Sequence, residues 1–105
     1  MAQNRLRSKR LRLDNYLKTL TPNVYFQPPA SIMMSYPAIR YRRSSIDANF
    51  ADNLPYQATA VYELIVIDRD PDSDIVEELS KQPKTIHVRH YTSDNLNHDV
   101  FRTYV

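Results

Sequence analysis

The chain contains no glycine, and this absence restricts its possible folds and functions more than any other feature of its 105 residues. Glycine is the residue that lets the backbone take positive φ or approach a phosphate group closely. Without it, the chain cannot carry the dinucleotide-binding fingerprint of a Rossmann fold, a P-loop or the nucleophile elbow of an α/β-hydrolase. Its turns must instead be built from Pro, Asn, Asp and Ser.

Cysteine is absent too, so no disulfide, thiolate metal site or thiol nucleophile can form. No apolar segment approaches about 18 residues, so we expect no membrane span. The start of the chain has no apolar stretch typical of a secretory signal, so we expect assembly in the cytoplasm. The length is that of one domain. We therefore expect a single domain over residues 1–105, in which residues 1–12 form a basic N-terminal extension that is flexible or is ordered by a partner.

Apolar periodicity predicts two helices and several short strands. Helices are expected over residues 4–20 and from Asp72, Ser73 or Asp74 to about Gln82. Strands are expected over residues 38–43, 56–68, 84–91 and 100–105, with Val24–Gln27 either a short edge strand or an extended connector. Residues 44–55 and 92–97, rich in Ser, Asp and Asn, are predicted to be loops. Because most connections are too short for parallel crossovers, we expect an α+β fold with helices on one face of an antiparallel sheet.

Charge is unevenly distributed along the chain, although the formal net charge is only +2. Basic residues gather at the start of the chain, and acidic residues follow the longest predicted strand. The two groups are Arg5, Arg7, Lys9, Arg10 and Arg12, and Asp68, Asp70, Asp72, Asp74, Glu77 and Glu78. Opposed patches on one small chain suit head-to-tail assembly. The alternative is that each group is a solvated face.

Alternation within two strands predicts further contact surfaces. Arg40 and Arg42 fall on the outer face of strand 38–43. In strand 56–68 the even positions from 56 to 66 are all apolar, and Ile65 and Ile67 make the other face apolar at its end. This pattern predicts that a helix or a neighbouring subunit covers that end. We therefore expect the charged groups, Arg40, Arg42, Ile65 and Ile67 to form subunit or partner interfaces.

The three histidines do not predict a metal site. In strand 84–91, Ile86 and Val88 are expected to point into the core. On a regular strand, His87 and His90 would point to opposite faces, so they could not bind one metal ion together. His98 is expected to make a local hydrogen bond in its turn.

No other group of residues predicts catalysis. The aspartates at alternate positions 68–74 are spaced like the start of a calcium loop, but the glycine and the glutamate that complete this loop are missing. Ser93, Asp94 and His98 could be arranged as a triad, but no oxyanion hole is recognisable near them. We therefore predict no catalytic residue, metal or cofactor, and a chain that is not an enzyme. The basic residues leave DNA binding open as an alternative.

Five segments between Tyr25 and Phe101 resemble the tail terminator, or tail-completion, family of long-tailed phages. They are Tyr25-Phe26-Gln27-Pro28-Pro29, Tyr36-Pro37-Ala38-Ile39-x-Tyr41, Ala51-Asp52-Asn53-x-Pro55-Tyr56, Val66-Ile67-Asp68-Arg69-Asp70-Pro71-Asp72-Ser73, and His90-Tyr91-Thr92-Ser93-Asp94-Asn95-Leu96-Asn97-His98-Asp99-Val100-Phe101, where x is any residue. None of these segments is a catalytic signature, and the family has no catalytic residue to carry over.

The resemblance implies an α+β subunit that forms a hexameric ring in the virion, at the head-proximal end of the tail. Such a ring would cap the tail tube, stop the polymerisation of the tube protein and form the joint to the head. DNA would pass through its central hole without being read. The implied partners are further copies of this chain, the tail tube protein and a head-tail connector or head-completion protein. The alternatives are a head-completion protein at the same joint and a small DNA-binding protein that uses the basic N-terminus.

Overall fold

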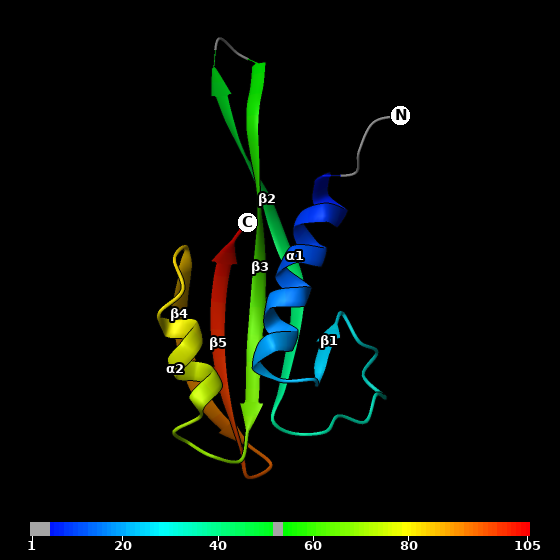
Figure 1. Cartoon of the computed structure of the whole chain (residues 1–105), viewed down its shortest axis with the longest axis vertical. Coiled ribbons are helices and arrows are strands. Elements are labelled where there is room, and N and C mark those ends of the chain that lie inside the picture. Colours follow the sequence, from blue (N-terminus) through cyan, green and yellow to red (C-terminus); the bar gives the residue numbers. More distant parts are fainter. Residues whose placement is uncertain (1–4, 52–53) are drawn as a thin grey trace.

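The computed structural model describes residues 5–51 and 54–105, with side chains for residues 5–47 and 59–105. It contains two helices and a five-stranded sheet (Figure 1). The elements are α1 (Arg5–Leu20), β1 (Val24–Phe26), β2 (Ala38–Ala51), β3 (Leu54–Asp68), α2 (Asp74–Ser80), β4 (Thr85–Ser93) and β5 (Leu96–Tyr104). No helix in these ranges is long and apolar enough to cross a membrane. Asn4, the first residue of the predicted N-terminal helix, lies outside the described residues, whereas residues 5–12 of the predicted basic extension belong to α1.

The strands lie in the order β1-β2-β3-β5-β4, and both helices cover the same face of the sheet (Figure 1). The predicted α+β fold is thus confirmed. The expectation of a purely antiparallel sheet is wrong at one edge, where β1 runs parallel to β2 and Val24 lies opposite Ile39. The proline-rich connection 27–37 is long enough to return the chain to the same end of the sheet, which a short turn could not do. The sheet is therefore mixed.

The hydrophobic core lies between the helices and the covered sheet face. Leu17 of α1, Leu64 of β3 and Phe101 of β5 have no exposed surface. The other buried members of the core are Leu13, Ile39, Tyr41, Ala60, Tyr62, Val66, Ile75 and Leu79. The even positions of β3 from 60 to 66 are all buried, as alternation predicted, whereas the side chains of Tyr56 and Ala58 lie outside the described part.

A buried polar contact fastens α1 to the sheet. The Tyr41 hydroxyl donates a hydrogen bond of 2.7 Å to Asp14 Oδ1, and Lys18 Nζ lies 2.6 Å from the other carboxylate oxygen. Although burial opposes ionisation of Asp14, the hydrogen bonds and charge of its partners lower the pKa of this carboxyl. Burial, and then the hydrogen bond to Asp14, raise the pKa of Tyr41 well above its ordinary value. Both shifts favour a charged acceptor and a protonated donor in the folded state.

Helix α2 begins where capping chemistry predicted. Of the three candidate caps, Ser73 occupies the position, and its Oγ accepts a hydrogen bond of 3.3 Å from the Ile75 amide. The aspartates before it form turns, because the Asp68 and Asp70 carboxylates accept hydrogen bonds from the Asp70 and Asp72 amides. The alternating aspartates therefore have a structural explanation as turn residues.

The β4–β5 turn shows how a chain without glycine makes a tight hairpin. Asp94 and Asn95 both take positive φ, at 54° and 62°. Positive φ at two successive turn residues is the geometry of the two-residue hairpin turn that matches strand twist, and Asp and Asn tolerate it better than most residues. The predicted loop 92–97 is therefore reduced to two residues, and β5 begins at Leu96 instead of Val100.

Candidate assembly surfaces

The segment predicted to be a loop over residues 44–55 is instead the end of a long β-hairpin. β2 continues to Ala51 and β3 begins at Leu54, with Asp47 paired to Thr59 and Ala48 to Ala58. The pairing of β3 with β5 stops at Val61, and Ala60 bonds to the backbone of Val105. Beyond this point, among the described residues, the two strands pair only with each other. We call residues 47–51 and 54–59 the arm, which projects beyond the rest of the molecule (Figure 1).

The sheet face turned away from the helices carries the four strand residues predicted to form an interface. Arg40 lies opposite Ile65, and Ala38 lies opposite Ile67. Arg40 is exposed and Ile65 is half-buried, whereas Ile67 is buried within the single chain. Arg42 is ion-paired with Glu63, Nε to Oε1 at 3.2 Å. Arg40, Arg42 and Ile65 thus line one shallow hollow of about 310 Å³ on this face.

β4 adds exposed apolar side chains to the same face, contrary to prediction. Ile86 and Val88 were expected to point inward, but they are 54% and 42% exposed. Tyr91, stacked on His98 at 4.7 Å between ring centroids, is also exposed. β4 is an edge strand, and the core residue next to it under the helices, Phe101, belongs to β5. The apolar positions of β4 therefore lie on the side that no helix covers.

A β-bulge at Val88 overturns the prediction for the histidines. The register shifts between His87 and Arg89, so that His87 lies opposite Phe101 and His90 opposite Asp99. An extra residue in a strand returns the side chains on either side of it to one face. His87 Nε2 and His90 Nδ1 both lie 3.0 Å from Asp99 Oδ1, which is buried. Even so, within the described ranges no group of three or more His, Asp and Glu side chains is arranged to hold a metal ion.

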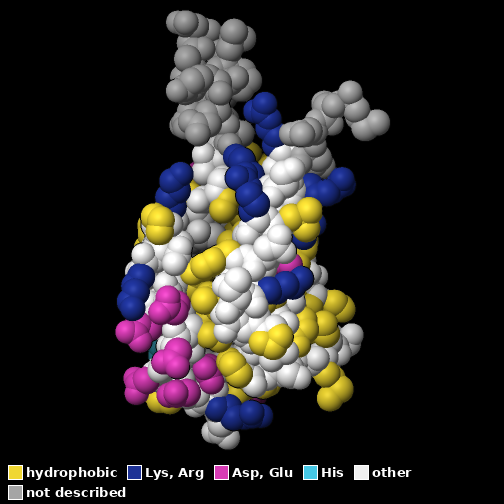
Figure 2. Space-filling model, in the orientation of Figure 1, with side chains coloured by type: hydrophobic (Ala, Val, Ile, Leu, Met, Phe, Trp, Pro, Cys, Tyr) yellow, Lys and Arg dark blue, Asp and Glu magenta, His cyan; other side chains and the backbone are white. Residues whose placement is uncertain are grey.

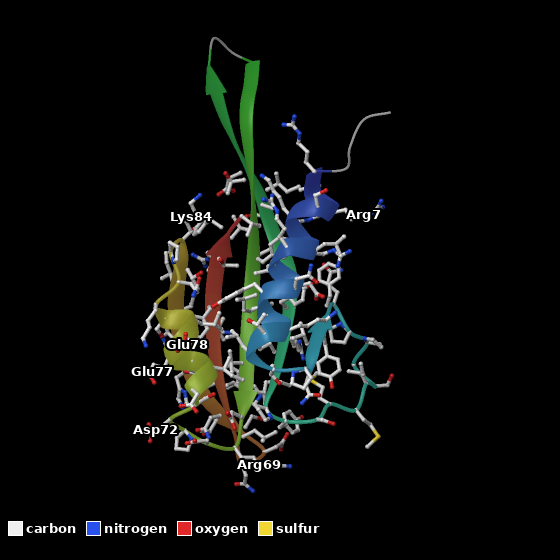
Figure 3. The ribbon with its side chains drawn as sticks, in the orientation of Figure 1. Arg7, Arg69, Asp72, Glu77, Glu78 and Lys84 are labelled. Carbon is white, nitrogen blue, oxygen red and sulfur yellow. The ribbon has the colours of Figure 1, made fainter. Side chains whose placement is uncertain are left out.

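The predicted basic and acidic groups lie toward opposite ends of the long axis (Figure 2). In Figure 3, Arg7 and Lys84 point outward near the arm, whereas Asp72 lies at the far end. Arg5 and Arg12 are exposed on α1. Arg10 makes a cation–π contact within the same chain, because its guanidinium lies 4.5 Å from the centre of the Phe26 ring.

The acidic end comprises the turn before α2 and the first residues of that helix. Asp70, Asp72 and Asp74 are exposed, and in the described part of the chain none of them forms an ion pair with Lys or Arg. Glu77 and Glu78 share one weak partner, since Lys81 Nζ lies 3.7 and 3.9 Å from their carboxylates. The acidic end is therefore largely uncompensated.

A cleft that the sequence did not predict lies between the two helices, near the basic end. Its volume is about 490 Å³, with Leu13, Leu64 and Leu79 among its apolar residues. Three basic residues, three threonines, Tyr16 and Val105 are among the other lining residues; the basic ones are Lys9, Arg12 and Lys84. The cleft combines α1, the residues after α2 and the ends of β3 and β5. Elements so far apart in the chain leave no local sequence signal.

The residues considered for a catalytic triad do not form one. Ser93 and Asp94 lie at the β4–β5 hairpin, while His98 Nδ1 contacts the Leu96 carbonyl oxygen at 3.2 Å. This is the local contact expected for His98. Comparisons with protein-family models, curated proteins and solved structures found no match for this chain.

Proposed function

We propose that this chain is a non-enzymatic structural subunit that assembles with copies of itself into a ring. The arm is the observation that carries this proposal. A two-stranded hairpin without a third strand or a covering helix is marginally stable in water. The backbone pairing from Asp47 to Ala51 and from Leu54 to Thr59 has no such support in the described residues. A neighbouring subunit that packs against the arm would supply the missing contacts.

Two further surfaces favour assembly over a solitary domain. The exposed side chains of Ile86, Val88 and Tyr91 lie along an edge strand that covers no core. Exposed edge strands and apolar patches of this kind favour association with other chains. The charged ends lie apart, so that the basic end of one copy can face the acidic end of the next. Such a contact joins different surfaces of the two copies and builds rings or filaments.

The specific form that we propose is the tail terminator ring of a long-tailed phage, which caps the tail tube and forms the joint to the head. The support for this form is the resemblance of the five segments between Tyr25 and Phe101. All five include residues that connect elements. Segments 25–29 and 36–41 include parts of the connection 27–37, residues 51–56 lie where β2 gives way to β3, residues 66–73 include the acidic turn, and residues 90–101 include the β4–β5 turn. Connections are where contacts with other molecules are most often made. A head-completion protein at the same joint is the nearest alternative.

The test shortens the arm without disturbing the body of the protein. Replacing residues 48–58 by Asn-Gly joins Asp47 to Thr59, which are paired in the sheet, through a turn suited to hairpins. Because the variant keeps every described core residue and the pairing of Asp47 with Thr59, we expect it to fold and to show the circular dichroism spectrum of the wild type. We expect light scattering to give a ring mass for the wild type, alone or with tail tube protein, and a monomer mass for the variant.

A matched control keeps the arm at full length. The double substitution Asp52→Asn, Asn53→Gly introduces the same dipeptide without shortening either strand, and should assemble like the wild type. A wild-type protein that stays monomeric and ignores the tube protein would refute the proposed function. Salt-dependent binding of DNA by that monomer would favour the DNA-binding alternative, because neutralised phosphates release counterions.

A further inference from the structure

The cleft between α1 and α2 has the composition of a site for an acidic ligand. Its basic side chains come from two sides, Lys9 and Arg12 from α1 and Lys84 from the position before β4. No Asp or Glu is among the described residues that line it. Lys9 Nζ donates to the main-chain oxygen of Val105 at 3.5 Å, which holds this side chain over the cleft. Among the described lining residues, the charged side chains are therefore all basic.

Polar groups inside the cleft add hydrogen-bonding capacity. The Tyr16 hydroxyl oxygen is buried, and it has no hydrogen-bond partner among the described residues. Burial, and then the charge of Glu78, raise the pKa of Tyr16, so the phenol keeps its proton. A buried donor without a partner lowers stability unless something occupies the site. Thr59, Thr85 and Thr103 also line the cleft, and the Thr85 and Thr103 hydroxyls bond to each other at 2.9 Å.

The acidic end of the same chain has the complementary chemistry. Asp70, Asp72 and Asp74 are exposed without ion pairs to described Lys or Arg residues, and Glu77 follows one helical turn later. A single copy cannot place this end in its own cleft, because the segment lies at the N-terminus of α2 and the cleft opens beside the C-terminal end of that helix. Figure 3 shows this separation between Lys84 and Asp72.

We propose that the cleft of one subunit receives the acidic end of the next, and that this is the lateral contact of the ring. This inference rests on the proposed function, because its occupant is a second copy. The volume of about 490 Å³ leaves room for several acidic side chains of a peptide segment. A nucleic-acid phosphate would use the cations alone.

The experiment exchanges charges between the two surfaces. One variant carries Arg12→Glu and Lys84→Glu in the cleft, and the other carries Asp72→Lys and Glu77→Lys at the acidic end. In each variant alone, like charges face each other, so we expect the dissociation constant for self-association to rise by at least about tenfold. In an equal mixture, every cleft can meet an end of opposite charge. The mixture should therefore assemble with both proteins alternating in the ring.

The matched control adds negative charge at positions that belong to none of the proposed contacts. Ser31→Glu and Ser35→Glu lie at exposed positions of the connection 27–37, away from the cleft, so this protein should assemble like the wild type. Sedimentation velocity gives the masses, and circular dichroism shows that each protein is folded. Failure of the mixture to assemble, or an equal loss of assembly in the control protein, would overturn the assignment of the cleft.

Two other outcomes separate this inference from the proposed function. If the wild type and the cleft variant assemble equally well, the cleft is not the contact, although the ring proposal survives. If the wild type does not assemble, both proposals fall. If the cleft variant instead loses salt-dependent binding to a 20-base-pair DNA duplex and still assembles, the cleft is a phosphate site and the inference is wrong.

Discussion

Replacing Tyr41 by Phe tests whether the buried polar contact under α1 stabilises the fold as its geometry indicates. The substitution removes one hydroxyl group and leaves the ring that packs against Phe26 and Tyr62. The lost hydrogen bond is 2.7 Å long, is buried and has a charged acceptor. Hydrogen bonds of this kind contribute about 1.5–3 kcal/mol. Asp14 keeps Lys18 as a partner, so we expect a loss of about 2 kcal/mol at pH 7.

The pH dependence of this loss follows from the two pKa shifts. The pKa of Asp14 is lowered in the folded protein, so the stability that its carboxylate contributes is present above the ordinary pKa of about 3.9 and is lost as the pH falls through the lowered value. The pKa of Tyr41 is raised, so the wild type loses stability as the pH rises above about 10. The difference between wild type and variant should therefore be largest between about pH 5 and 9 and should narrow on both sides.

Urea unfolding followed by circular dichroism at pH 3, 7 and 10.5 measures this difference directly. For a domain of this length, a loss of about 2 kcal/mol lowers the unfolding temperature by about 10 °C. Tyr91→Phe is the matched control, because Tyr91 lies on the exposed sheet face and should change stability by less than about 0.5 kcal/mol. A Tyr41→Phe protein as stable as this control at pH 7, or a difference that grows on acidification, would refute the reasoning.

Two further predictions concern local structure. Ser73→Ala removes the side-chain acceptor at the start of α2 and should lower the free energy of unfolding, measured in urea, by about 1 kcal/mol. Ser73→Asn keeps a side-chain acceptor at this position and should retain most of the wild-type stability. Deleting Val88 should be tolerated at a cost below about 1.5 kcal/mol, because this half-exposed side chain is the extra residue of a bulge and its removal keeps His90 opposite Asp99. Unchanged ring-proton NMR shifts of His87 and His90 would support this view of the bulge, and unfolding on deletion would contradict it.

The elements that sequence predicted well are those that cover the core. Apolar residues recur at helical spacing in α1 and α2 and at every second position in the body of β3. They do so because one side of each element belongs to the core around Leu17, Leu64 and Phe101. The arm was missed only in part, because residues 56–59 fall within the predicted strand 56–68. Residues 47–55 were assigned to a loop, since Asp47, Asn49 and Pro55 are residues typical of turns. Backbone pairing between β2 and β3 nevertheless continues there.

The site residues divide in the same way. Charge runs showed which residues would form the basic and acidic surfaces, but only the folded chain shows that they lie at opposite ends. One inserted residue, Val88, reversed the expectation for His87 and His90, since side-chain alternation counts residues and cannot detect a bulge. The cleft could not be predicted at all, because Arg12, Lys84 and Thr103 come together only when α1 packs beside the end of α2.

The arm and the cleft would contribute differently to the proposed ring, and the difference follows from their chemistry. Contacts between charges steer subunits together and fix their register, but those that stay near solvent are screened beyond about 8 Å at physiological salt. Packing against the arm buries backbone and apolar surface, which salt does not weaken in this way. A contact between two different surfaces can build an open filament as well as a closed ring. The assembly closes only where the repeated rotation between neighbouring copies brings the last copy back to the first. The arm lies at the end of the molecule that carries the cleft, so a neighbour seated in the cleft would be within its reach, and the arm would then restrict the rotation between the two copies. The charged contact would therefore select the neighbour, and the arm would determine whether the assembly closes.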